Sequence, residues 1–209
     1  VCYPIDYSPN TVSSGVGPSP RTIFCLAADA VGVLPPISIL DRNAAIYHFV
    51  SGYTSKLAGT EYGVTEPEAT FSKCFGDPFF PLDTALYAQQ FGRRVEKSGA
   101  NVFLINTGWT GGSYGKGHRI PLKYTRAMIN AALNGDLDFV EYVKEPFFNL
   151  KIPRSCPGVP AEMLNPKNTW SNKREYDKTA KKLTKMFQEN FKKYNLPNTV
   201  VKAGPGSYK

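Results

Sequence analysis

The chain has 209 residues, 42% of them hydrophobic and 13% aromatic, so it can bury a sizeable core as one globular domain or as most of a larger one. No run approaches the roughly 20 apolar residues of a membrane helix and no signal-peptide pattern opens the chain, so we expect no membrane partner and a cytoplasmic location. The net charge of +8 comes entirely from an excess of Lys and Arg after residue 166, which argues against a basic nucleic-acid-binding surface over the whole molecule.

The chain begins with residues 1–20, which are rich in Pro, Gly and Ser and are predicted to form an irregular lead-in. It does not start with Met, and we expect it to be part of a longer protein. The apolar run TIFCLAA at 22–28 predicts a buried strand. A loop follows, because Pro35 and Pro36 exclude a helix.

Asp41 can cap a helix that we predict over 42–57. Its apolar residues fall on one side of a helix with 3.6 residues per turn. They are Ile46, Phe49, Val50, Tyr53 and Leu57.

The residues that could bind a metal are few and scattered. The four cysteines form no C-x-x-C pair and there are only two histidines, so a zinc site is not expected. Cys25 and Cys74 lie in apolar runs, which favours buried free thiols in a reducing compartment over a disulfide framework. His48 lies in the predicted helix with no second ligand at i+4, so we assign it no chemistry.

Residues 58–77 have no sustained period and contain several glycines and prolines, so we predict one long loop. Such a loop is either a functional lid or a solvated connector. A helix is predicted from Thr84 to Lys97, closed by Ser98-Gly99, and a buried strand at 101–106.

Five glycines lie between Gly108 and Gly117, after this strand and before a helix predicted over 123–134. The segment matches neither the P-loop G-x-x-x-x-G-K-[ST] nor the dinucleotide pattern G-x-G-x-x-G. A loop at the carboxyl end of a strand is nevertheless where open α/β sheets bind ligands, and the order of elements predicts an α/β fold.

Three residues after the glycines could hold an adenine nucleotide. Arg119 offers a planar cation, Ile120 an apolar contact and Thr125 a hydroxyl group. The alternative is a charged helix entrance that contributes only solubility.

An amphipathic helix is predicted over 171–195, with Asn172 and Glu175 at the spacing of a capping box. It either packs an aromatic stripe on the core or binds nucleic acid through its lysine face. The stripe consists of Tyr176, Ala180, Leu183, Phe187, Phe191 and Tyr194.

Several long motifs in order resemble the ATP-dependent phosphoenolpyruvate carboxykinases. They are ADAVGVLPPISIL, YHFVSGYTSKLAGTEYGVTEPEATFSKCFGDPFFPL, NTGWTGGSYGKGHRIPLKYTRAMINAALNG and SCPGVPAEMLNPKNTWSNKREYD. They span most of residues 24–195. The small departures from the family pattern are Ser113, Lys116, His118 and Tyr124, which bear on nucleotide affinity.

The resemblance implies a carboxy-lyase of gluconeogenesis that converts oxaloacetate and ATP to phosphoenolpyruvate, ADP and CO2 with Mg²⁺ and Mn²⁺. In such a reaction decarboxylation leaves an enolate, whose oxygen attacks the γ-phosphate. Arg119, Ile120 and Thr125 match the family's adenine-nucleotide contacts. Residues 58–77 match its lid, in which we single out Glu61, Thr65, Glu66 and Thr70.

The resemblance further implies that the P-loop, the metal ligands and the oxaloacetate-binding arginine all precede Val1. We therefore expect residues 1–209 to be the C-terminal portion of the carboxykinase nucleotide-binding domain, a mixed sheet with flanking helices. We expect no catalytic or metal-binding residue in it, no tightly bound cofactor and no activity by itself. Two alternatives are a stand-alone adenine-nucleotide-binding or interaction module without catalysis, and a nucleic-acid-binding protein that uses the C-terminal helix.

Overall fold

The computed structural model describes residues 2–56, 59 and 62–206, and its centre is a five-stranded mixed sheet. The strand order is β1-β5-β2-β9-β8, with β1 parallel to β5 and the other pairs antiparallel. The strands are β1 (Thr22–Ala27), β2 (Ile37–Leu40), β5 (Asn101–Asn106), β8 (Tyr142–Lys144) and β9 (Lys151–Pro153).

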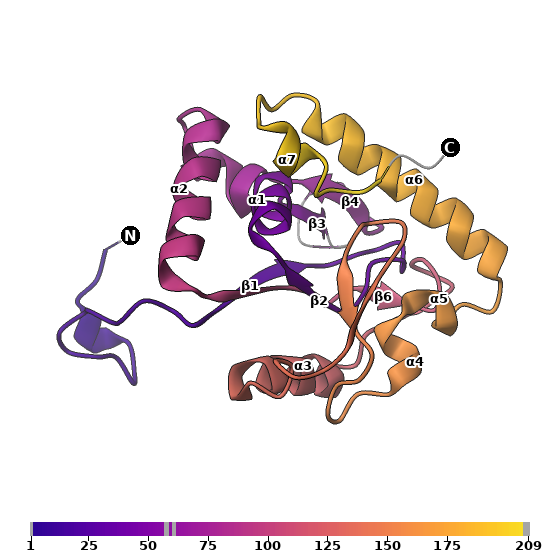
Figure 1. The fold of residues 1–209 in the computed structure, drawn as a ribbon, viewed down its shortest axis with the longest axis horizontal. Coiled ribbons are helices and arrows are strands. Elements are labelled where there is room, and N and C mark those ends of the chain that lie inside the picture. The colour runs from indigo at the N-terminus through magenta and orange to yellow at the C-terminus, as the bar shows by residue number, and fades with distance from the viewer. Residues whose placement is uncertain (1, 57–58, 60–61, 207–209) are drawn as a thin grey trace.

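Helices cover both faces of this sheet (Figure 1). One face carries α1 (Arg42–Ser51), α2 (Thr84–Ser98), α6 (Lys173–Phe191) and α7 (Asn198–Val201). The other carries α3 (Leu122–Asn134) and α4 (Ala161–Leu164), and α5 (Pro166–Thr169) leads into α6. The predicted α/β fold with a mixed sheet and flanking helices is confirmed. Among the described residues, no helix combines the length and apolar character that a bilayer crossing requires.

The two faces have cores of different composition. Under α1 and α6 the core is rich in aromatic side chains, which include Tyr47, Phe148, Tyr176 and Phe187. Under α3 it is mainly aliphatic and includes Ile37, Ile105, Met128, Leu137 and Leu164. The sheet is therefore buried on both faces, as expected for an α/β protein.

The predicted strands were found, but one is less buried than expected. β5 fills 101–106 and its last five residues are buried. β1 lies at the edge of the described sheet, and its Leu26 is 54% exposed. β2 was not predicted as a strand, because it has only four residues and directly follows two prolines.

The helix predicted over 42–57 was wrong at its C-terminal end. Asp41 caps α1 as expected, by accepting hydrogen bonds from Asn43 N and Ala44 N. The helix ends at Ser51, because Gly52 takes a left-handed conformation that stops it. Tyr53, expected on the helix face, begins strand β3 instead, and Leu57 lies outside the described residues.

The prediction of one long loop over 58–77 was wrong from Glu68 onward, whereas 62–67 are irregular as predicted and 58, 60 and 61 lie outside the described residues. β3 (Tyr53–Lys56) pairs antiparallel with β4 (Glu68–Phe71), and each strand has only four residues. Two 3-10 turns follow, at Lys73–Phe75 and Asp77–Phe79. We call residues 53–71 the arm.

The helices predicted over 84–97 and 123–134 were found, and the one predicted over 171–195 is the shorter α6, whereas β6 (Trp109–Thr110), β7 (His118–Arg119), β8, β9, α4, α5 and α7 were not predicted. α2 and α3 end at Gly99 and Gly135, both left-handed. α6 begins after Asn172, whose side chain accepts from Arg174 N and Glu175 N. The lead-in contains one 3-10 turn at Ile5–Tyr7, and all four cysteines are free thiols, with Cys25 and Cys74 buried.

Candidate functional site

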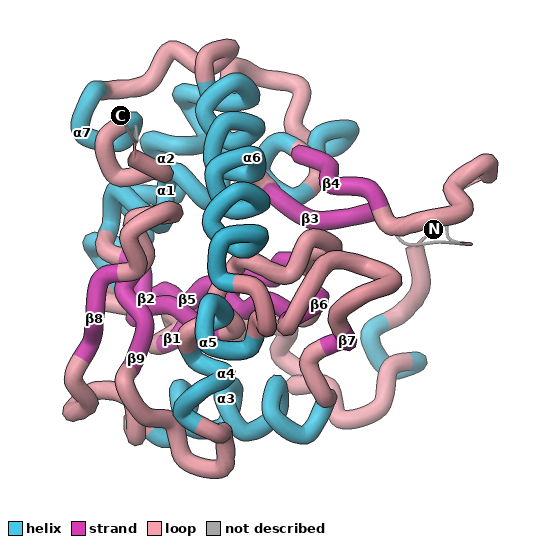
Figure 2. Tube along the Cα trace, turned by 90° about the vertical axis from the view of Figure 1, so that its right-hand side faces the viewer, coloured by secondary structure: helices cyan, strands magenta, loops and turns pink. Residues whose placement is uncertain are grey.

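The glycine-rich loop, residues 107–117, leaves the carboxyl end of β5 and packs against the segment that follows β1. We call that segment, residues 29–34, the bridge segment. β6 (Trp109–Thr110) in the loop pairs with β7 (His118–Arg119) just after it, and strands β3 and β4 lie above this small hairpin on the same side of the molecule (Figure 2).

Backbone contact between the loop and the bridge segment explains several of the glycines. A Cβ atom on Gly32 would lie 2.1 Å from Gly112 O, and one on Gly108 would lie 2.2 Å from Asp29 N. Gly32 also has a φ of +74°, which L side chains rarely adopt. These glycines allow two backbones to touch, a role that requires no ligand.

Asp29 organises the bridge segment from within. Its carboxylate is fully buried and accepts hydrogen bonds from Val31 N at 2.9 Å, Val33 N at 2.7 Å and Leu34 N at 2.8 Å. Tyr53 Oη donates a fourth at 2.8 Å. Burial raises the pKa of Asp29, and these hydrogen bonds oppose that rise by stabilising the carboxylate.

Asn106, the last residue of β5, ties the two segments together. Its Oδ1 accepts from Asp29 N at 3.0 Å and from Gly108 N at 2.9 Å, and its Nδ2 donates to Leu34 O at 2.9 Å. Our sequence analysis assigned no role to Asp29 or Asn106. The sequence did contain a signal for Asp29, because it is an ionisable residue inside an otherwise apolar run between two strands.

Arg119 is exposed at the end of the hairpin and is held in a fixed orientation. Its Nη2 and Nε donate to Thr107 O at 3.1 and 3.4 Å. Its guanidinium carbon lies 5.2 Å from the centroid of the Trp109 ring, whose other neighbour is Tyr114. The guanidinium therefore has a hydrogen-bond acceptor and an aromatic ring as neighbours within the chain.

Ile120 and Thr125 lie beside Arg119 in sequence but are buried, each at 6% exposure. Ile120 belongs to the aliphatic core under α3, and its backbone N donates to Gly108 O at 2.8 Å. Of the three predicted nucleotide contacts, only Arg119 therefore offers an open side chain. The side chain of Ile120, which we expected to contact the adenine base, instead packs in the aliphatic core.

The predicted lid residues lie in different parts of the arm. Thr70 lies in β4, opposite Thr54, and is partly buried, whereas Thr65 and Glu66 lie in the exposed connection. Glu61 lies outside the described residues. The base of the arm is anchored, because the rings of Tyr53 and Phe71 lie 4.9 and 5.1 Å from that of Phe187.

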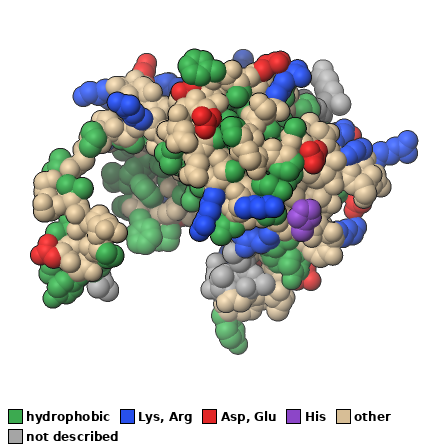
Figure 3. All heavy atoms as spheres, turned by 90° about the horizontal axis from the view of Figure 1, so that it is seen from below, with side chains coloured by type: hydrophobic (Ala, Val, Ile, Leu, Met, Phe, Trp, Pro, Cys, Tyr) green, Lys and Arg blue, Asp and Glu red, His purple; other side chains and the backbone are tan. Residues whose placement is uncertain are grey.

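Positive charge surrounds this region. Lys and Arg side chains gather beside a histidine on the face seen from below (Figure 3), and His118 and Arg119 are both exposed. Lys116 in the loop forms an ion pair at 2.9 Å with Glu175 at the start of α6. Apart from the ion-paired Lys116, the exposed Lys and Arg side chains on this face favour an anionic ligand.

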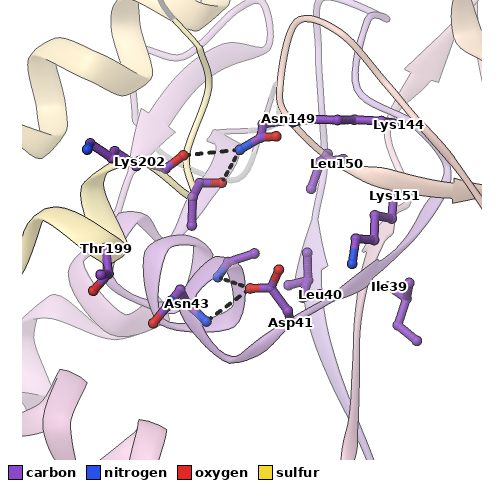
Figure 4. Close-up of a pocket in the computed structure, with 12 residues that line it drawn as sticks. Ile39, Leu40, Asp41, Asn43, Lys144, Asn149, Leu150, Lys151, Thr199 and Lys202 are labelled. Atoms are coloured by element: carbon purple, nitrogen blue, oxygen red, sulfur yellow. Dashed lines mark hydrogen bonds between the residues drawn. The ribbon is translucent and has the colours of Figure 1, made fainter.

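A separate cavity of about 300 Å³ lies where β9 and the end of α7 meet the start of α1 (Figure 4). Two of its polar side chains serve the fold, since Asp41 caps α1 and Asn149 Nδ2 donates to Lys202 O and Ala203 O. They maintain the fold at this end of the molecule, and we assign them no chemistry.

The described residues offer no donor set for a metal, since no three His, Cys, Asp or Glu side chains among them are grouped closely enough. His48 is 2% exposed, and burial lowers its pKa to about 4. His48 is therefore a neutral residue of the core at neutral pH.

Comparison with known proteins gives a consistent result. A family sequence model described as phosphoenolpyruvate carboxykinase matches residues 1–162. Proteins named "Phosphoenolpyruvate carboxykinase (ATP)" from Caldanaerobacter subterraneus subsp. tengcongensis and Thermus thermophilus are 60% and 53% identical to the chain. "Phosphoenolpyruvate carboxykinase (ATP) 1" of Moorella thermoacetica is 56% identical. Each match covers 97% of this chain but only 39% of the relative's length.

Proposed function

The chain belongs to the ATP-dependent phosphoenolpyruvate carboxykinase family, and on that premise we propose that it supplies the adenine-binding face and the lid of such an enzyme. The complete protein would convert oxaloacetate and ATP to phosphoenolpyruvate, ADP and CO2. The complete protein would act in the cytoplasm, in gluconeogenesis.

The orientation of Arg119 is the observation that carries this proposal. Its exposed guanidinium donates to Thr107 O and lies over Trp109, and we propose that a purine ring stacks on the part of the guanidinium that these contacts leave exposed. Stacking on a fixed plane loses less side-chain entropy than stacking on a free arginine. Ile120 and Thr125 act indirectly in this proposal, because their buried side chains support the end of the hairpin that carries Arg119.

The lid is the exposed part of the arm, which contains Thr65 and Glu66, and the anchored base supports it. Closure over the substrates would exclude water from the enolate. Mg²⁺ and Mn²⁺, when bound, would stabilise charge on the phosphates and the enolate oxygen. The described residues do not fit either ion, so we assign no step in this chain to a metal.

We infer that residues 1–209 have no carboxykinase activity of their own, because the phosphate-binding and metal-binding groups would lie in the rest of the protein. Mn²⁺-dependent formation of phosphoenolpyruvate by the purified 209-residue chain would contradict this. Tight ATP binding by the inactive chain would instead favour a stand-alone adenine-binding module, because we expect residues 1–209 of a larger enzyme to bind no cofactor tightly.

The adenine site is tested by Arg119→Ala in the complete enzyme. Loss of a cation–π contact of about 0.5–2 kcal/mol predicts a rise of roughly 2- to 30-fold in the KM for ATP. The KM for oxaloacetate and kcat should change little, because the base carries no developing charge in the reaction. Steady-state kinetics with each substrate varied separately gives the answer.

Lys123→Ala is the matched control, because Lys123 is a nearby exposed cation whose ammonium lies over the Tyr124 ring instead. It should leave the KM for ATP within about twofold, since a surface charge contributes little by itself. Equal effects of the two variants, or an Arg119 effect confined to oxaloacetate, would remove Arg119 from the adenine site.

A further inference from the structure

The hairpin of β8 and β9 carries two lysines directly opposite each other. Lys144 in β8 is the register partner of Lys151 in β9, and the two strands run antiparallel. Register partners extend from the same face of a sheet with their Cβ atoms about 5 Å apart, and like charges at such positions repel each other. The pair therefore lowers the stability of the hairpin unless a group of opposite charge covers it.

No acidic side chain in the described part of the chain neutralises this pair. Neither Lys144 nor Lys151 forms an ion pair with a described residue, and both are exposed. Glu145 follows directly after β8, but it is 3% exposed and its carboxylate accepts hydrogen bonds from Phe147 N at 3.0 Å and Phe148 N at 2.6 Å. The acid nearest in sequence therefore builds the turn between the strands and leaves both ammonium groups open to a ligand.

Both lysines line the cavity of about 300 Å³ between β9, the start of α1 and the end of α7 (Figure 4). In that view the ammonium group of Lys151 is directed toward Asp41 and Leu40. Lys202 lines the cavity as a third cation, and its side chain is turned outward. Asp41 is the one acid among the described residues of the lining, and its Oδ1 accepts from two backbone N–H groups of α1. With three lysines and one aspartate, the lining has a net charge of +2.

Asn149 fixes the walls of this cavity relative to each other. Its φ of +61° is uncommon for a residue other than glycine. From this position its Nδ2 donates to the carbonyl oxygens of Lys202, Ala203 and Gly204 at 3.2, 3.1 and 3.3 Å. The hairpin and the segment after α7 are therefore joined, and the cavity is present before any ligand binds.

We propose that this cavity binds a phosphate group, either as the free ion or on a small monoester, with Lys144 and Lys151 as its direct contacts. A phosphate monoester carries a charge of about −1.5 to −2 at pH 7, which balances the charge of the lining. Two ammonium groups so close together converge on one anion, and a phosphate concentrates its charge on one group, whereas a dicarboxylate divides it between two. Lys202 reaches the same group by rotating its flexible side chain.

The rest of the lining limits what can accompany the phosphate. Leu40, Ala44 and Leu150 are apolar, and Asn43 and Thr199 are short polar residues. A volume of about 300 Å³ lies at the lower end of the range for small-molecule sites, so the organic part of the ligand must be short. The lining residues lie outside the glycine-rich loop, the bridge segment and the arm, so the inference does not rest on the proposed adenine site.

The test is binding of inorganic phosphate to the complete enzyme, measured by calorimetry at constant ionic strength. MgATP is kept saturating, so that phosphate cannot occupy the nucleotide site. Lys151→Gln should raise the dissociation constant roughly 10-fold, the scale of one hydrogen bond to a charged group. A second titration with glycerol phosphate distinguishes the two sources of the phosphate group, because the ligand that binds more tightly identifies the preferred form.

Lys181→Gln is the matched control. Lys181 is an exposed lysine of α6 that forms no ion pair with a described residue and does not line the cavity. Its loss should change the dissociation constant by less than about twofold, because a single exposed charge contributes little at a distance. Equal effects of the two variants would show a general attraction of anions to a basic protein and would overturn the site.

Lys144→Glu gives a second readout of opposite sign. It places a carboxylate opposite Lys151, so the enzyme should unfold at a higher temperature in the absence of phosphate. Phosphate should stabilise the unaltered enzyme because it binds only the folded state, and the variant should lose that stabilisation. Thermal unfolding with and without phosphate measures both effects and establishes that each variant is folded.

Three further results would overturn the proposal. If chloride at the same ionic strength stabilises the enzyme as much as phosphate does, the effect is screening alone. If Lys144→Glu is more stable and still binds phosphate normally, the two lysines only protect β8, an edge strand of the described sheet, from pairing with another chain. If the unaltered enzyme binds no phosphate in the presence of MgATP, another part of the complete protein covers the pair, and the cavity is not a binding site.

Discussion

Helix α6 and the glycine-rich loop meet at the Lys116–Glu175 ion pair, but they are held in place by different kinds of contact. α6 is fixed by side chains, because its residues Tyr176, Ala180, Leu183, Phe187 and Phe191 are all buried in the aromatic core. The loop is fixed by its backbone, through hydrogen bonds to Asp29 and Ala30 and through the close approach of Gly32 and Gly112.

The difference decides what each region tolerates. A helix fixed by side chains tolerates change on its exposed face and loses stability when a buried ring is removed. A loop fixed by its backbone has few side chains to lose, and added atoms are what it cannot accept. Truncation should therefore damage α6 most, and enlargement should damage the loop most.

The largest effect is expected from Phe187→Ala in α6. Phe187 is fully buried, and its ring lies near those of Tyr53, Phe71 and His48. Removing it should lower the free energy of unfolding by about 3–5 kcal/mol, since the transfer and cavity effects add. Urea unfolding followed by circular dichroism measures this.

Lys182→Ala, on the exposed face of α6, provides the control and should change the free energy of unfolding by less than about 0.5 kcal/mol. Similar losses in the two variants would mean that α6 does not depend on its buried face, and the comparison would fail.

The second effect concerns pH and two ionisable groups beneath α6. Burial raises the pKa of Glu145 to about 7 and lowers that of His48 to about 4. The folded state therefore favours protonated Glu145, whose contribution to stability is lost as pH rises from 4.5 to 7. It also favours neutral His48, whose contribution is lost as pH falls from 6.5 to 4. Over pH 4.5–6.5 the two slopes oppose each other.

Single variants should separate the two opposing pH dependences of the free energy of unfolding. With Glu145→Gln, acidification from pH 6.5 to 4 should lower the free energy of unfolding by about 3 kcal/mol relative to the unaltered chain, at 1.36 kcal/mol per pKa unit. With His48→Leu, acidification from pH 7 to 4.5 should instead raise it. Chemical unfolding over this pH range checks both, and identical pH profiles for the three chains would show that neither group is shifted.

The two regions also differed in how well the sequence predicted them. The 3.6-residue spacing of the aromatic residues in α6 and its N-cap at Asn172 are local features, so both could be predicted. The role of Gly32 could not, because it depends on Gly112, which is distant along the chain. The burial of Ile120 was missed for the same reason. The arm was missed because β3 is only four residues long and directly follows a helix whose end only Gly52 marks.

An intermediate effect is expected from Gly108→Ala. The new methyl group would overlap the backbone of Asp29, with atoms as close as 2.2 Å, so the loop or the bridge segment must shift. We expect a loss of about 1–3 kcal/mol in the free energy of unfolding, typical of overpacking. We also expect a higher KM for ATP, because Trp109 and Arg119 move with the loop.

Gly115→Ala is the control for added volume, because no atom lies within 4 Å of a Cβ atom at that position. Its φ of +83° is unfavourable for alanine, so a smaller loss of stability is expected, without the change in KM. If Gly108→Ala left the KM for ATP unchanged, close backbone approach would not position Arg119.

The smallest effect is expected at the ion pair that joins the two regions. The side chains of Lys116 and Glu175 are 69% and 43% exposed, so a double-mutant cycle of alanine substitutions should give a coupling energy of about 0.2–1 kcal/mol that declines with added salt.

The same ion pair decides how α6 is capped. Asn172 and Glu175 have the spacing of a capping box, but the Glu175 carboxylate accepts from Lys116 instead. The cap is made by Asn172, whose side chain accepts from two backbone N–H groups. Asn172→Ala should therefore lower the free energy of unfolding by about 0.5–2 kcal/mol, more than Glu175→Ala does. If Glu175→Ala has the larger effect and the coupling to Lys116 is zero, the carboxylate serves the helix alone, and nothing at this ion pair ties the glycine-rich loop to α6.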